Sequence, residues 1–366
     1  MSSPLLVIAA GGTGGHMFPA QALAEEMLRR GWRVQLATDR RGLRYAGGFP
    51  EAVERIEFRS GTFSQGGVTA KLMAPFRILL GILAAIRQFR TDPPACIAGF
   101  GGYPALPALA AAWRLGLPRL IHEQNGVLGR VNRLFARRVD RVACGTWPVT
   151  NAPGGAALEH LGNPVRDTVL AVLDQPYSPP GGGRIDLLVF GGSQGASVFA
   201  KLVPGAVSLL PEALRQRLAV TQQVRPGEEG PVRAAYESAG VDADLAIFFD
   251  DMPRRIAAAQ LVISRAGAST VAELAAIGRP AILVPYPHAM DDHQTANAMA
   301  LVAPGGAILA PEAELTTDAL ARHIRAVLLE PGQAAHMAAQ ARAQGRPQAA
   351  RDLADMVAAL GKRGAA

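Results

Sequence analysis

The feature that most restricts the fold is a pattern that occurs twice: an apolar stretch, a glycine-rich loop and a helix-like stretch. The first copy runs from Leu5–Ala10 into GGTGGH, residues 11–16, and the second runs from Ile185–Phe190 into GGSQGA, residues 191–196. A fully apolar strand is expected where helices cover both faces of a parallel sheet. The repeat therefore predicts an α/β protein with two Rossmann-like, doubly wound parallel-sheet domains, whose glycine loops face a cleft.

Breaks between these patterns predict the domain limits. A proline- and glycine-rich segment, residues 174–184, separates the halves, and Pro164 is a candidate hinge. We expect one domain over residues 1–163 and another over residues 164–340. The helix expected in residues 341–366 either stays with the second domain or packs back on the first. Further strands are predicted at Val34–Thr38, Ala95–Ala98, Arg119–His122, Arg141–Cys144, Leu218–Gln222, Ala246–Phe249, Leu261–Ser264 and Ala281–Pro285.

Composition narrows the function classes. The chain has 366 residues, too many for one ordinary core, and no apolar stretch reaches the ~20 residues that span a bilayer. The net charge of +7 indicates an anionic partner. Phosphorylated substrates or an acidic membrane surface fit this charge better than nucleic acid, because no aromatic platform accompanies the scattered arginines. Cys96 and Cys144 lie in apolar runs, which is typical of buried, reduced thiols.

Both glycine loops predict anion sites. Glycines let backbone N–H groups approach an anion at a helix N-terminus, where the helix dipole favours negative charge. The first loop departs from the dinucleotide pattern G-x-G-x-x-G, because Met17 occupies the third glycine position. Asp39 nevertheless ends the second strand, where a dehydrogenase carries its ribose-binding acid. In the second loop, Ser193 adds a hydroxyl that can donate to a phosphate oxygen.

The most specific pattern lies in the second half. RAGASTVAE occupies residues 265–273, and DDHQTANA occupies residues 291–298. A strand ends at Ser264 and a helix begins at Ser269-Thr270, so the helix start can bind a phosphate. Glu273, one turn into that helix, can accept both hydroxyls of a ribose. The competing interpretation is a capped surface helix with Glu273 in its first turn.

In combination, these motifs resemble those of one enzyme family. GGTGGHMFPA, GGYPALPALAA, HEQNGVLGRVNR, GNPVR, GGSQGA, DDM, RAGASTVAE and DDHQTANA follow one another across residues 11–300. The chain thus resembles the bacterial peptidoglycan N-acetylglucosaminyltransferases, which have the GT-B fold. The resemblance implies inverting transfer of N-acetylglucosamine from UDP-N-acetylglucosamine to the muramyl 4-hydroxyl of lipid I. Lipid I is undecaprenyl-diphospho-N-acetylmuramoyl-pentapeptide, and the product is lipid II, which serves peptidoglycan synthesis.

The resemblance also implies a setting and a set of donor contacts. It implies an enzyme without a cofactor, peripheral on the cytoplasmic face of the cell inner membrane, with cell-wall synthesis proteins as candidate partners. His293 stands where relatives carry a second glutamine, and it stays unassigned. The positions that match the family's contacts to UDP-N-acetylglucosamine are Thr13, Gly14, Gly15, Asn125, Arg166, Ser193, Phe249, Ala268, Ser269, Thr270, Val271, Ala272, Glu273 and Gln294.

Inverting transfer needs a base near the acceptor hydroxyl and stabilisation of the departing diphosphate. His16 is the leading candidate base, because an imidazole can accept a proton near neutral pH. Its competing role is to donate a hydrogen bond to a substrate. Glu123 is the second candidate base, and its competing role is to orient Asn125 or the loop.

We predict no metal site. Asp250-Asp251 and Asp291-Asp292 are adjacent pairs, whose side chains often diverge, rather than a D-x-D motif. Arg166, Ser193 and the helix start near Ser269 can balance the charge of the diphosphate instead.

Residues 71–90 form a candidate membrane-binding helix. Apolar residues recur there at helical spacing among Lys71 and three arginines, as in helices that lie at a membrane surface. The apolar members are Phe76, Leu79, Leu80, Leu83 and Ile86. Periodicity alone does not separate this helix from a core helix with basic ends. The lipid acceptor implied by the resemblance favours docking on the anionic inner leaflet.

Other functions stay open beside the transferase. A UDP-sugar 2-epimerase shares the architecture, and another UDP-sugar glycolipid synthase also meets a membrane. A non-catalytic nucleotide-sugar-binding protein would keep the donor site without needing His16. An NAD-dependent oxidoreductase would use Asp39, but it leaves GGSQGA and residues 265–297 without a role.

Overall fold

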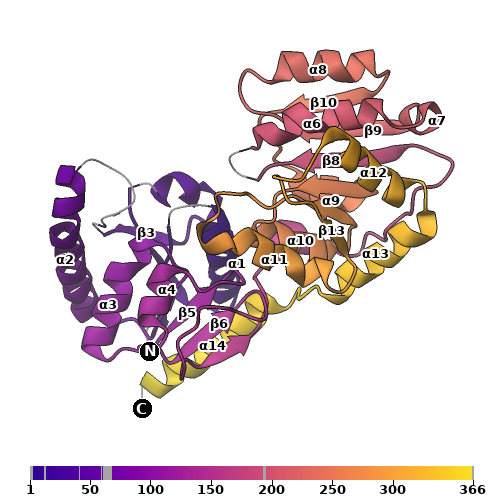
Figure 1. Cartoon of the computed structure of the whole chain (residues 1–366). Coiled ribbons are helices and arrows are strands. Elements are labelled where there is room, and N and C mark those ends of the chain that lie inside the picture. Colours follow the sequence, from indigo (N-terminus) through magenta and orange to yellow (C-terminus); the bar gives the residue numbers. More distant parts are fainter. Residues whose placement is uncertain are drawn as a thin grey trace. The chain divides into compact units, whose positions relative to one another are not determined.

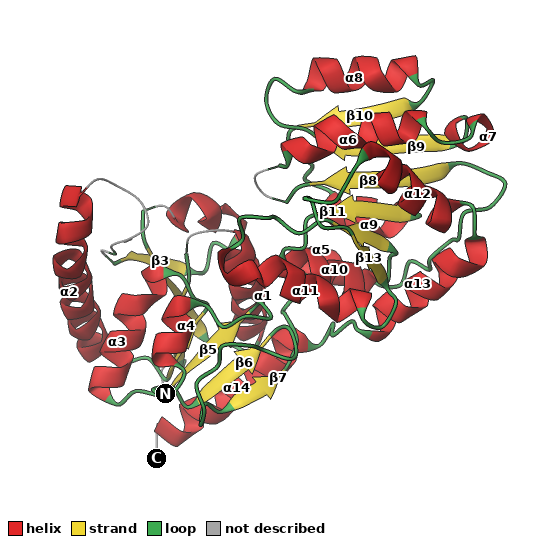
Figure 2. Cartoon of the chain, in the orientation of Figure 1, coloured by secondary structure: helices red, strands yellow, loops and turns green. Residues whose placement is uncertain are grey.

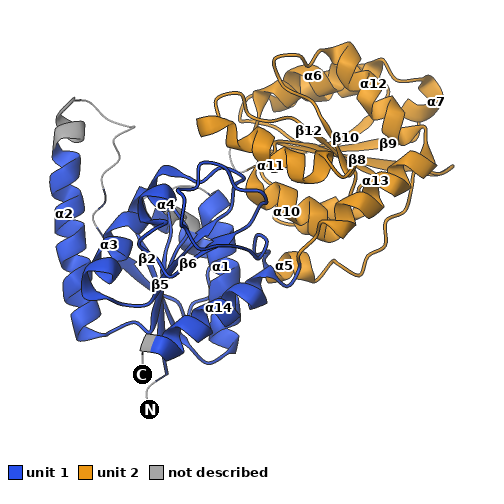
Figure 3. Ribbon diagram, turned by 60° about the horizontal axis from the view of Figure 1, so that its bottom comes forward, with its two compact units in different colours: residues 1–166, 347–366 blue, residues 167–346 orange. Residues whose placement is uncertain are grey.

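A computed structural model describes residues 3–11, 14–40, 42–58, 60, 68–192 and 195–364, without the side chains of residues 44, 45, 68–72 and 364. The chain forms two compact units (Figure 3): unit 1 comprises residues 1–166 and 347–366, and unit 2 comprises residues 167–346. The domain limits expected from the sequence, at residues 163 and 340, stay a prediction.

Unit 1 is built on a seven-stranded, fully parallel sheet in the order β3-β2-β1-β4-β5-β6-β7 (Figure 1). Its strands are β1 (Leu5–Ala9), β2 (Arg33–Thr38), β3 (Glu54–Glu57), β4 (Cys96–Gly99), β5 (Arg119–Glu123), β6 (Arg141–Cys144) and β7 (Leu158–His160). Its helices are α1 (Gly14–Arg29), α2 (Val68–Thr91), α3 (Leu106–Leu115), α4 (Arg130–Phe135) and α14 (Ala349–Gly364), with short 3₁₀ turns η1 (Gly42–Gly48) and η2 (Tyr103–Ala105).

Alternate residues of β1 explain why helices cover both faces of this sheet. Leu6 and Ile8 pack into one buried cluster with residues of α1 and α14, whereas Leu5 and Val7 pack into another with residues of α3 and α4. Every residue of β1 is buried. Helix α14 contacts α1 and β4, so the end of the chain completes the first face.

Unit 2 has a six-stranded parallel sheet in the order β10-β9-β8-β11-β12-β13 (Figure 2). Its strands are β8 (Ile185–Phe190), β9 (Leu218–Gln223), β10 (Asp242–Ala246), β11 (Leu261–Ser264), β12 (Ala281–Leu283) and β13 (Ala307–Leu309). Its helices are α5 (Asp167–Leu170), α6 (Ser197–Ser208), α7 (Glu212–Arg215), α8 (Glu229–Ser238), α9 (Met252–Ala258), α10 (Ala268–Ile277), α11 (His293–Val302), α12 (Thr317–Leu328) and α13 (Pro331–Ala343), with the 3₁₀ turn η3 (Met290–Asp292).

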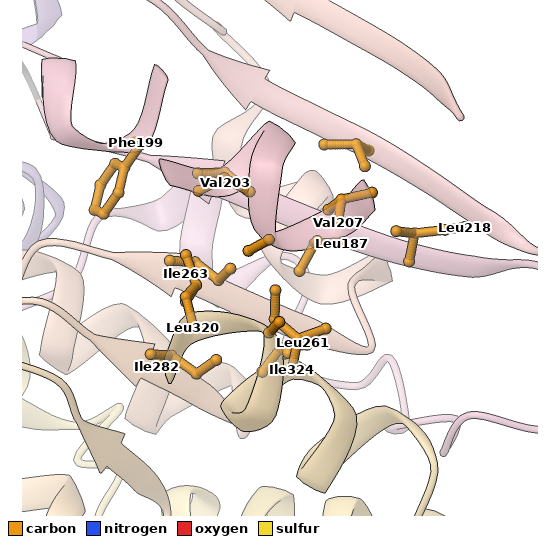
Figure 4. Packing of buried hydrophobic residues seen from close by; sticks show 14 of the residues in the cluster. Leu187, Phe199, Val203, Val207, Leu218, Leu261, Ile263, Ile282, Leu320 and Ile324 are labelled. Carbon is orange, nitrogen blue, oxygen red and sulfur yellow. The ribbon is translucent and has the colours of Figure 1, made fainter. Parts of the chain in front are cut away.

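The core of unit 2 lies between its sheet and the helices α6 and α12. Figure 4 shows Leu187 and Ile263 of the strands among Val203 of α6 and Leu320 of α12. Both sheets therefore have the doubly wound arrangement that the two apolar strand–loop patterns predicted.

One predicted strand is wrong, and three strands escaped prediction. Residues 246–249 were expected to form a strand, but β10 ends at Ala246. Ile247 and Phe248 follow it in a loop and are more than half exposed. The missed strands are β3, β7 and β13. They are three or four residues long and lie at or next to a sheet edge, where pairing needs little apolar character.

Helix α2 begins at Val68, three residues before the predicted start at residue 71, and Pro75 lies inside it. Ala74, Ala85 and Phe89 of this helix are buried, and α2 packs along α3. The interpretation as a core helix is therefore correct for one side of α2. In the part of the chain that the structure describes, no helix combines the length and apolarity needed to cross a bilayer.

Candidate functional site

Loops of two neighbouring strands, β1 and β4, meet at the point where the strand order of unit 1 reverses. Parallel sheets bind ligands beside the carboxyl ends of strands at this point. Gly11 is tightly packed there, because a Cβ on it would lie 2.6 Å from Cγ of Pro104. Gly101 and Gly102 have positive φ angles of 88° and 74°, which favour glycine. Gly14 and Gly15 lie in the first turn of α1, whereas Thr13 lies outside the described residues.

His16 lies in the first turn of α1 and is partly buried. Its Nδ1 is 3.1 Å from Oε1 of Gln124, which follows β5. A Cβ on Gly101 would lie 3.2 Å from Cε1 of His16, so the imidazole also packs against the loop after β4. The three loops that follow β1, β4 and β5 thus converge on this side chain.

Glu123 ends β5, and its carboxylate holds the following loop. The side chain is 1% exposed. Oε1 accepts hydrogen bonds from the backbone N–H (3.0 Å) and the side-chain amide (3.1 Å) of Asn125. Oε2 accepts from the backbone N–H of Gly129 (2.8 Å) and the amide of Asn132 (2.9 Å). Four donors therefore engage the carboxylate, which favours the predicted orienting role over that of a base.

His122 lies beneath the same loop and is fully buried. Its Nε2 donates to the carbonyl of Gly162 at 3.2 Å, and its ring packs against Phe100 with centroids 5.3 Å apart. Burial lowers the pKa of His122 from 6.5 to about 4, and the proximity of His16 contributes in the same direction. This histidine is therefore neutral at neutral pH.

Lowering the pH is expected to destabilise the protein through His122. The unfolded chain takes up a proton on this residue below 6.5, whereas the folded chain does so only near about 4. Unfolding is therefore coupled to proton uptake in this window, and the free energy of unfolding should fall by up to about 3 kcal/mol as the pH drops through it. Urea titrations across the window measure this slope. The variant His122→Asn should lose most of it, and an undiminished slope in a folded variant would refute the assignment.

Arg166 ends unit 1. Its guanidinium lies over the ring of Phe18, 4.1 Å from the ring centroid. Phe18 belongs to α1, the helix that carries His16. Of the predicted residues in unit 1, the structure thus brings His16, Glu123 and Asn125 to the loops at the carboxyl edge of the sheet, and it packs Arg166 against α1.

In unit 2 the second glycine loop follows β8, again where the strand order reverses. A Cβ on Gly191 would lie 2.3 Å from the backbone nitrogen of Ala196, so only glycine fits. Gly192 and Gly195 have positive φ angles of 79° and 65°. The side chain of Gln223 accepts from the backbone N–H of Gly191 at 3.0 Å and so fixes the loop to β9. Ser193 lies outside the described residues.

Helix α10 starts beside this loop, after the neighbouring strand β11. Its first residues are Ala268, Ser269, Thr270, Val271 and Ala272. Gly267 occupies the N-cap position, and no side chain caps the helix. Glu273 is only 7% exposed. The interpretation as a capped surface helix is therefore wrong, because the cap is absent and the helix is largely buried.

Gln294 of α11 joins two loops of unit 2. Its Oε1 accepts from the backbone N–H of Ala266 at 3.2 Å and from that of Tyr286 at 2.9 Å. Asn297, one turn later, donates to the carbonyl of Ala266 at 3.1 Å. These bonds place Gln294 beside the segment that leads into α10.

Arg265 begins the same segment, and the sequence patterns indicated no separate role for it. It is 8% exposed and donates to the carbonyls of Val284 and Pro285 at 3.2 and 3.0 Å. It also pairs with Glu312 at 2.5 Å. The sequence signal that could have revealed Arg265 is an arginine directly after an apolar strand, because a charge that is buried there needs partners.

Phe249 lies in the loop after β10, is 7% exposed and packs under the guanidinium of Arg255 at 4.2 Å. Arg255 pairs with Asp251 at 2.7 Å and with Asp244 at 2.6 Å. The hydrogen bond from Arg255 lowers the pKa of Asp251 below its usual range. Among the described residues, no three His, Cys, Asp or Glu side chains gather as they would around a metal ion.

Comparison with family models identifies both halves of the chain. Residues 6–144 match the model described as the glycosyltransferase family 28 N-terminal domain. Residues 186–353 match the model described as the glycosyltransferase family 28 C-terminal domain. Together the two matches include most of both units.

Relatives cover nearly the whole chain. A protein of Rhodospirillum centenum is 51% identical over 362 residues, which cover 98% of this chain and 94% of that protein. A protein of Chelativorans sp. is 48% identical over 361 residues, covering 98% and 96%. Both are named UDP-N-acetylglucosamine–N-acetylmuramyl-(pentapeptide) pyrophosphoryl-undecaprenol N-acetylglucosamine transferase. The crystal structure of Acinetobacter baumannii MurG has a TM-score of 0.79 at 29% identity, covering 97% of this chain and 99% of that one.

Proposed function

The chain belongs to glycosyltransferase family 28, and on that premise we propose that its two units divide one transfer reaction between acceptor chemistry and donor binding. The chain is a UDP-N-acetylglucosamine-dependent N-acetylglucosaminyltransferase. It moves N-acetylglucosamine to N-acetylmuramyl-(pentapeptide) pyrophosphoryl-undecaprenol, lipid I, and forms lipid II. The observation that carries this function is the 48–51% identity to two transferases of that name over nearly the full chain.

His16 is the proposed base in unit 1. The acceptor hydroxyl loses its proton as its oxygen attacks the anomeric carbon, while the bond from that carbon to UDP breaks on the opposite face. The imidazole lies where the loops after β1, β4 and β5 converge, and it already has a hydrogen-bond partner that orients it. Glu123 accepts a hydrogen bond from Asn125 and so holds the loop after β5 in place beside His16.

Unit 2 is the proposed donor site. The backbone N–H groups at the start of α10 face no side-chain cap, so they suit the diphosphate, whose charge also favours the helix N-terminus. Glu273 would accept the ribose hydroxyls, Phe249 would contact uracil through its backbone, and Gln294 would contact the sugar hydroxyls. Thr13, Asn125, Arg166 and Ser193 complete the proposed donor contacts.

Transfer of radiolabelled N-acetylglucosamine to a short-chain lipid I analogue, in excess chelator, tests the proposed function. We expect labelled lipid product and released UDP, with little transfer to diacylglycerol or to a lipid that lacks the muramyl sugar. Preferred transfer to diacylglycerol would point to another glycolipid synthase. Donor binding without product would point to a nucleotide-sugar-binding protein. Activity that is lost in chelator and restored by magnesium would overturn the proposed metal independence.

The exposed side of α2 is the proposed membrane contact. Phe76, Leu79 and Leu83 are each more than half exposed, and Arg77 and Arg87 are exposed on the same helix. Leu80 and Ile86 are only partly exposed, so they contribute less than predicted. Apolar area flanked by basic residues binds an anionic bilayer surface. This exposed side supports our proposal that the enzyme docks on the cytoplasmic face of the inner membrane, as the family resemblance implies.

Replacing Leu79 and Leu83 together by glutamate is expected to abolish most binding to anionic liposomes. The change replaces two leucines that are each more than half exposed and adds two negative charges, which anionic lipids repel. Flotation with liposomes that contain anionic lipid measures the bound fraction. A matched control is the variant Leu209→Glu with Leu329→Glu, which changes two comparably exposed leucines of unit 2. Equal binding by the folded α2 variant and the control would rule out α2 as the contact.

A further inference from the structure

The amide of Gln124 contacts the proposed base, although the sequence patterns indicated no role for this residue. Gln124 follows β5 and is 1% exposed. Its Oε1 lies 3.1 Å from Nδ1 of His16. Its Nε2 donates to the carbonyl of Phe100 at 3.0 Å and lies 3.4 Å from the carbonyl of His122. Thr146 donates its hydroxyl to the carbonyl of Gln124 at 2.9 Å, so the backbone is held as well.

These contacts decide which way the amide points. The carbonyl oxygens of Phe100 and His122 can only accept hydrogen bonds, so the group that faces them must be the amide NH₂. The amide oxygen of Gln124 therefore faces His16. A carbonyl oxygen also only accepts, so Nδ1 of His16 must carry a proton; otherwise two lone pairs would face each other at 3.1 Å. The orientation follows from the chemistry of the neighbours rather than from the assignment of the amide atoms.

We propose that Gln124 is a positioning residue that holds neutral His16 with its proton on Nδ1, leaving the lone pair on Nε2 to accept the proton of the acceptor hydroxyl. This inference rests on the proposed role of His16 as base. After Nε2 is protonated, the N–H group at Nδ1 still donates its hydrogen bond to Gln124. The imidazole can therefore accept and release a proton without rotating. Unlike a carboxylate, the amide is neutral, so it fixes the tautomer without placing a negative charge beside the imidazole.

The two titratable residues that directly precede Gln124 on β5, His122 and Glu123, do not compete with the bond. His122, on β5, is neutral at neutral pH because burial lowers its pKa to about 4. The carboxylate of Glu123 accepts hydrogen bonds from Asn125, Gly129 and Asn132. The neutral amide of Gln124 is therefore the group that sets the tautomer of His16.

Nitrogen NMR of the wild-type protein tests the tautomer without any activity measurement. In protein labelled with ¹⁵N-histidine, long-range ¹H–¹⁵N correlations show which ring nitrogen carries the proton, and the variant His16→Gln identifies the signals. At a pH where the ring is neutral, we expect His16 to be protonated on Nδ1. A ring protonated mainly on Nε2, or an equal mixture of tautomers, would overturn the proposal.

The variant Gln124→Met tests the consequence for transfer. Methionine keeps a similar volume but removes the acceptor, so kcat should fall at least about tenfold, part of the about 10²–10⁴-fold that a general base contributes. The KM for UDP-N-acetylglucosamine should stay within about twofold, because the proposed donor contacts lie chiefly in unit 2 and Gln124 is not one of them. The control Gln35→Met removes another buried glutamine of unit 1, whose amide donates to Glu54 instead.

The outcomes separate this inference from the proposed function. If the folded variant Gln124→Met keeps the kcat of the control, Gln124 does not position the base. If the tautomer is as expected but His16→Gln transfers at the wild-type rate, the proposed role of His16 fails and the tautomer assignment survives. Should Gln124→Met not fold, the wild-type NMR measurement still decides the inference.

Discussion

Replacing His16 by alanine is expected to lower kcat for transfer to the lipid I analogue by about 10²- to 10⁴-fold, the usual contribution of a positioned base. The imidazole lies at the convergence of three loops and bonds to Gln124, whereas the proposed donor contacts to UDP lie chiefly in unit 2. The dissociation constant for UDP, measured by calorimetry, should therefore stay within about threefold, since little binding energy is lost. Steady-state kinetics with saturating donor measures kcat.

A matched control for this variant is His336→Ala, which changes an exposed histidine of α13. It should retain wild-type kcat. If folded His16→Ala protein had a near-normal kcat, His16 would not be the base. Its competing role, donating a hydrogen bond to a substrate, would then remain. If kcat and UDP affinity fell together, His16 would act in donor binding rather than in proton transfer.

Replacing Gly191 by alanine should weaken donor binding strongly. The new Cβ would lie 2.3 Å from the backbone nitrogen of Ala196 and 2.4 Å from the backbone carbon of Gly195, so the loop must open. Overpacking of this kind costs about 1–3 kcal/mol, which corresponds to roughly 5- to 150-fold in affinity if the strain falls on the bound state. Calorimetry with UDP measures the change.

The control for this loop is Gly227→Ala, elsewhere in unit 2. Gly227 has a φ of 87° and a Cβ on it would meet nothing within 4 Å, so the variant reports only the backbone strain of replacing a glycine. Its UDP affinity should equal that of the wild type. Normal UDP binding by a folded Gly191→Ala protein would remove this loop from the donor site.

The order of strong elements could be predicted from the sequence because buried parallel strands are largely apolar. Leu5–Ala9 is apolar throughout and Ile185–Phe190 is apolar except for Asp186, and both predicted strands are confirmed. The strand β10 has the sequence DADLA at a sheet edge, where polar residues face solvent. The apolar residues after it, Ile247 and Phe248, are exposed and misled the prediction. Apolar character locates central strands well and edge strands poorly.

The candidate site divides in a similar way. His16, Glu123 and Glu273 stand in motifs and could be named from the sequence, and so could Asn125 as a partner of Glu123, but the partner of His16 could not. Gln124 meets His16 across 108 residues of chain, and that pairing depends on the order of strands in the sheet. The four bonds that engage Glu123 likewise come from the path of the loop after β5. The sequence therefore left two roles open for Glu123, a base or a residue that orients the loop, and these bonds favour the second.

A single-turnover experiment tests the division of the reaction between the two units most directly. Enzyme in excess over radiolabelled UDP-N-acetylglucosamine is mixed with the lipid I analogue, and labelled lipid is followed in time at a series of enzyme concentrations that runs from below half-saturation of the donor to saturation. We expect the variant His16→Ala to slow the transfer step while the enzyme concentration for half-saturation stays normal, and Gly191→Ala to raise that concentration. Transfer by His16→Ala at the wild-type rate, or the same change in both variants, would contradict the account.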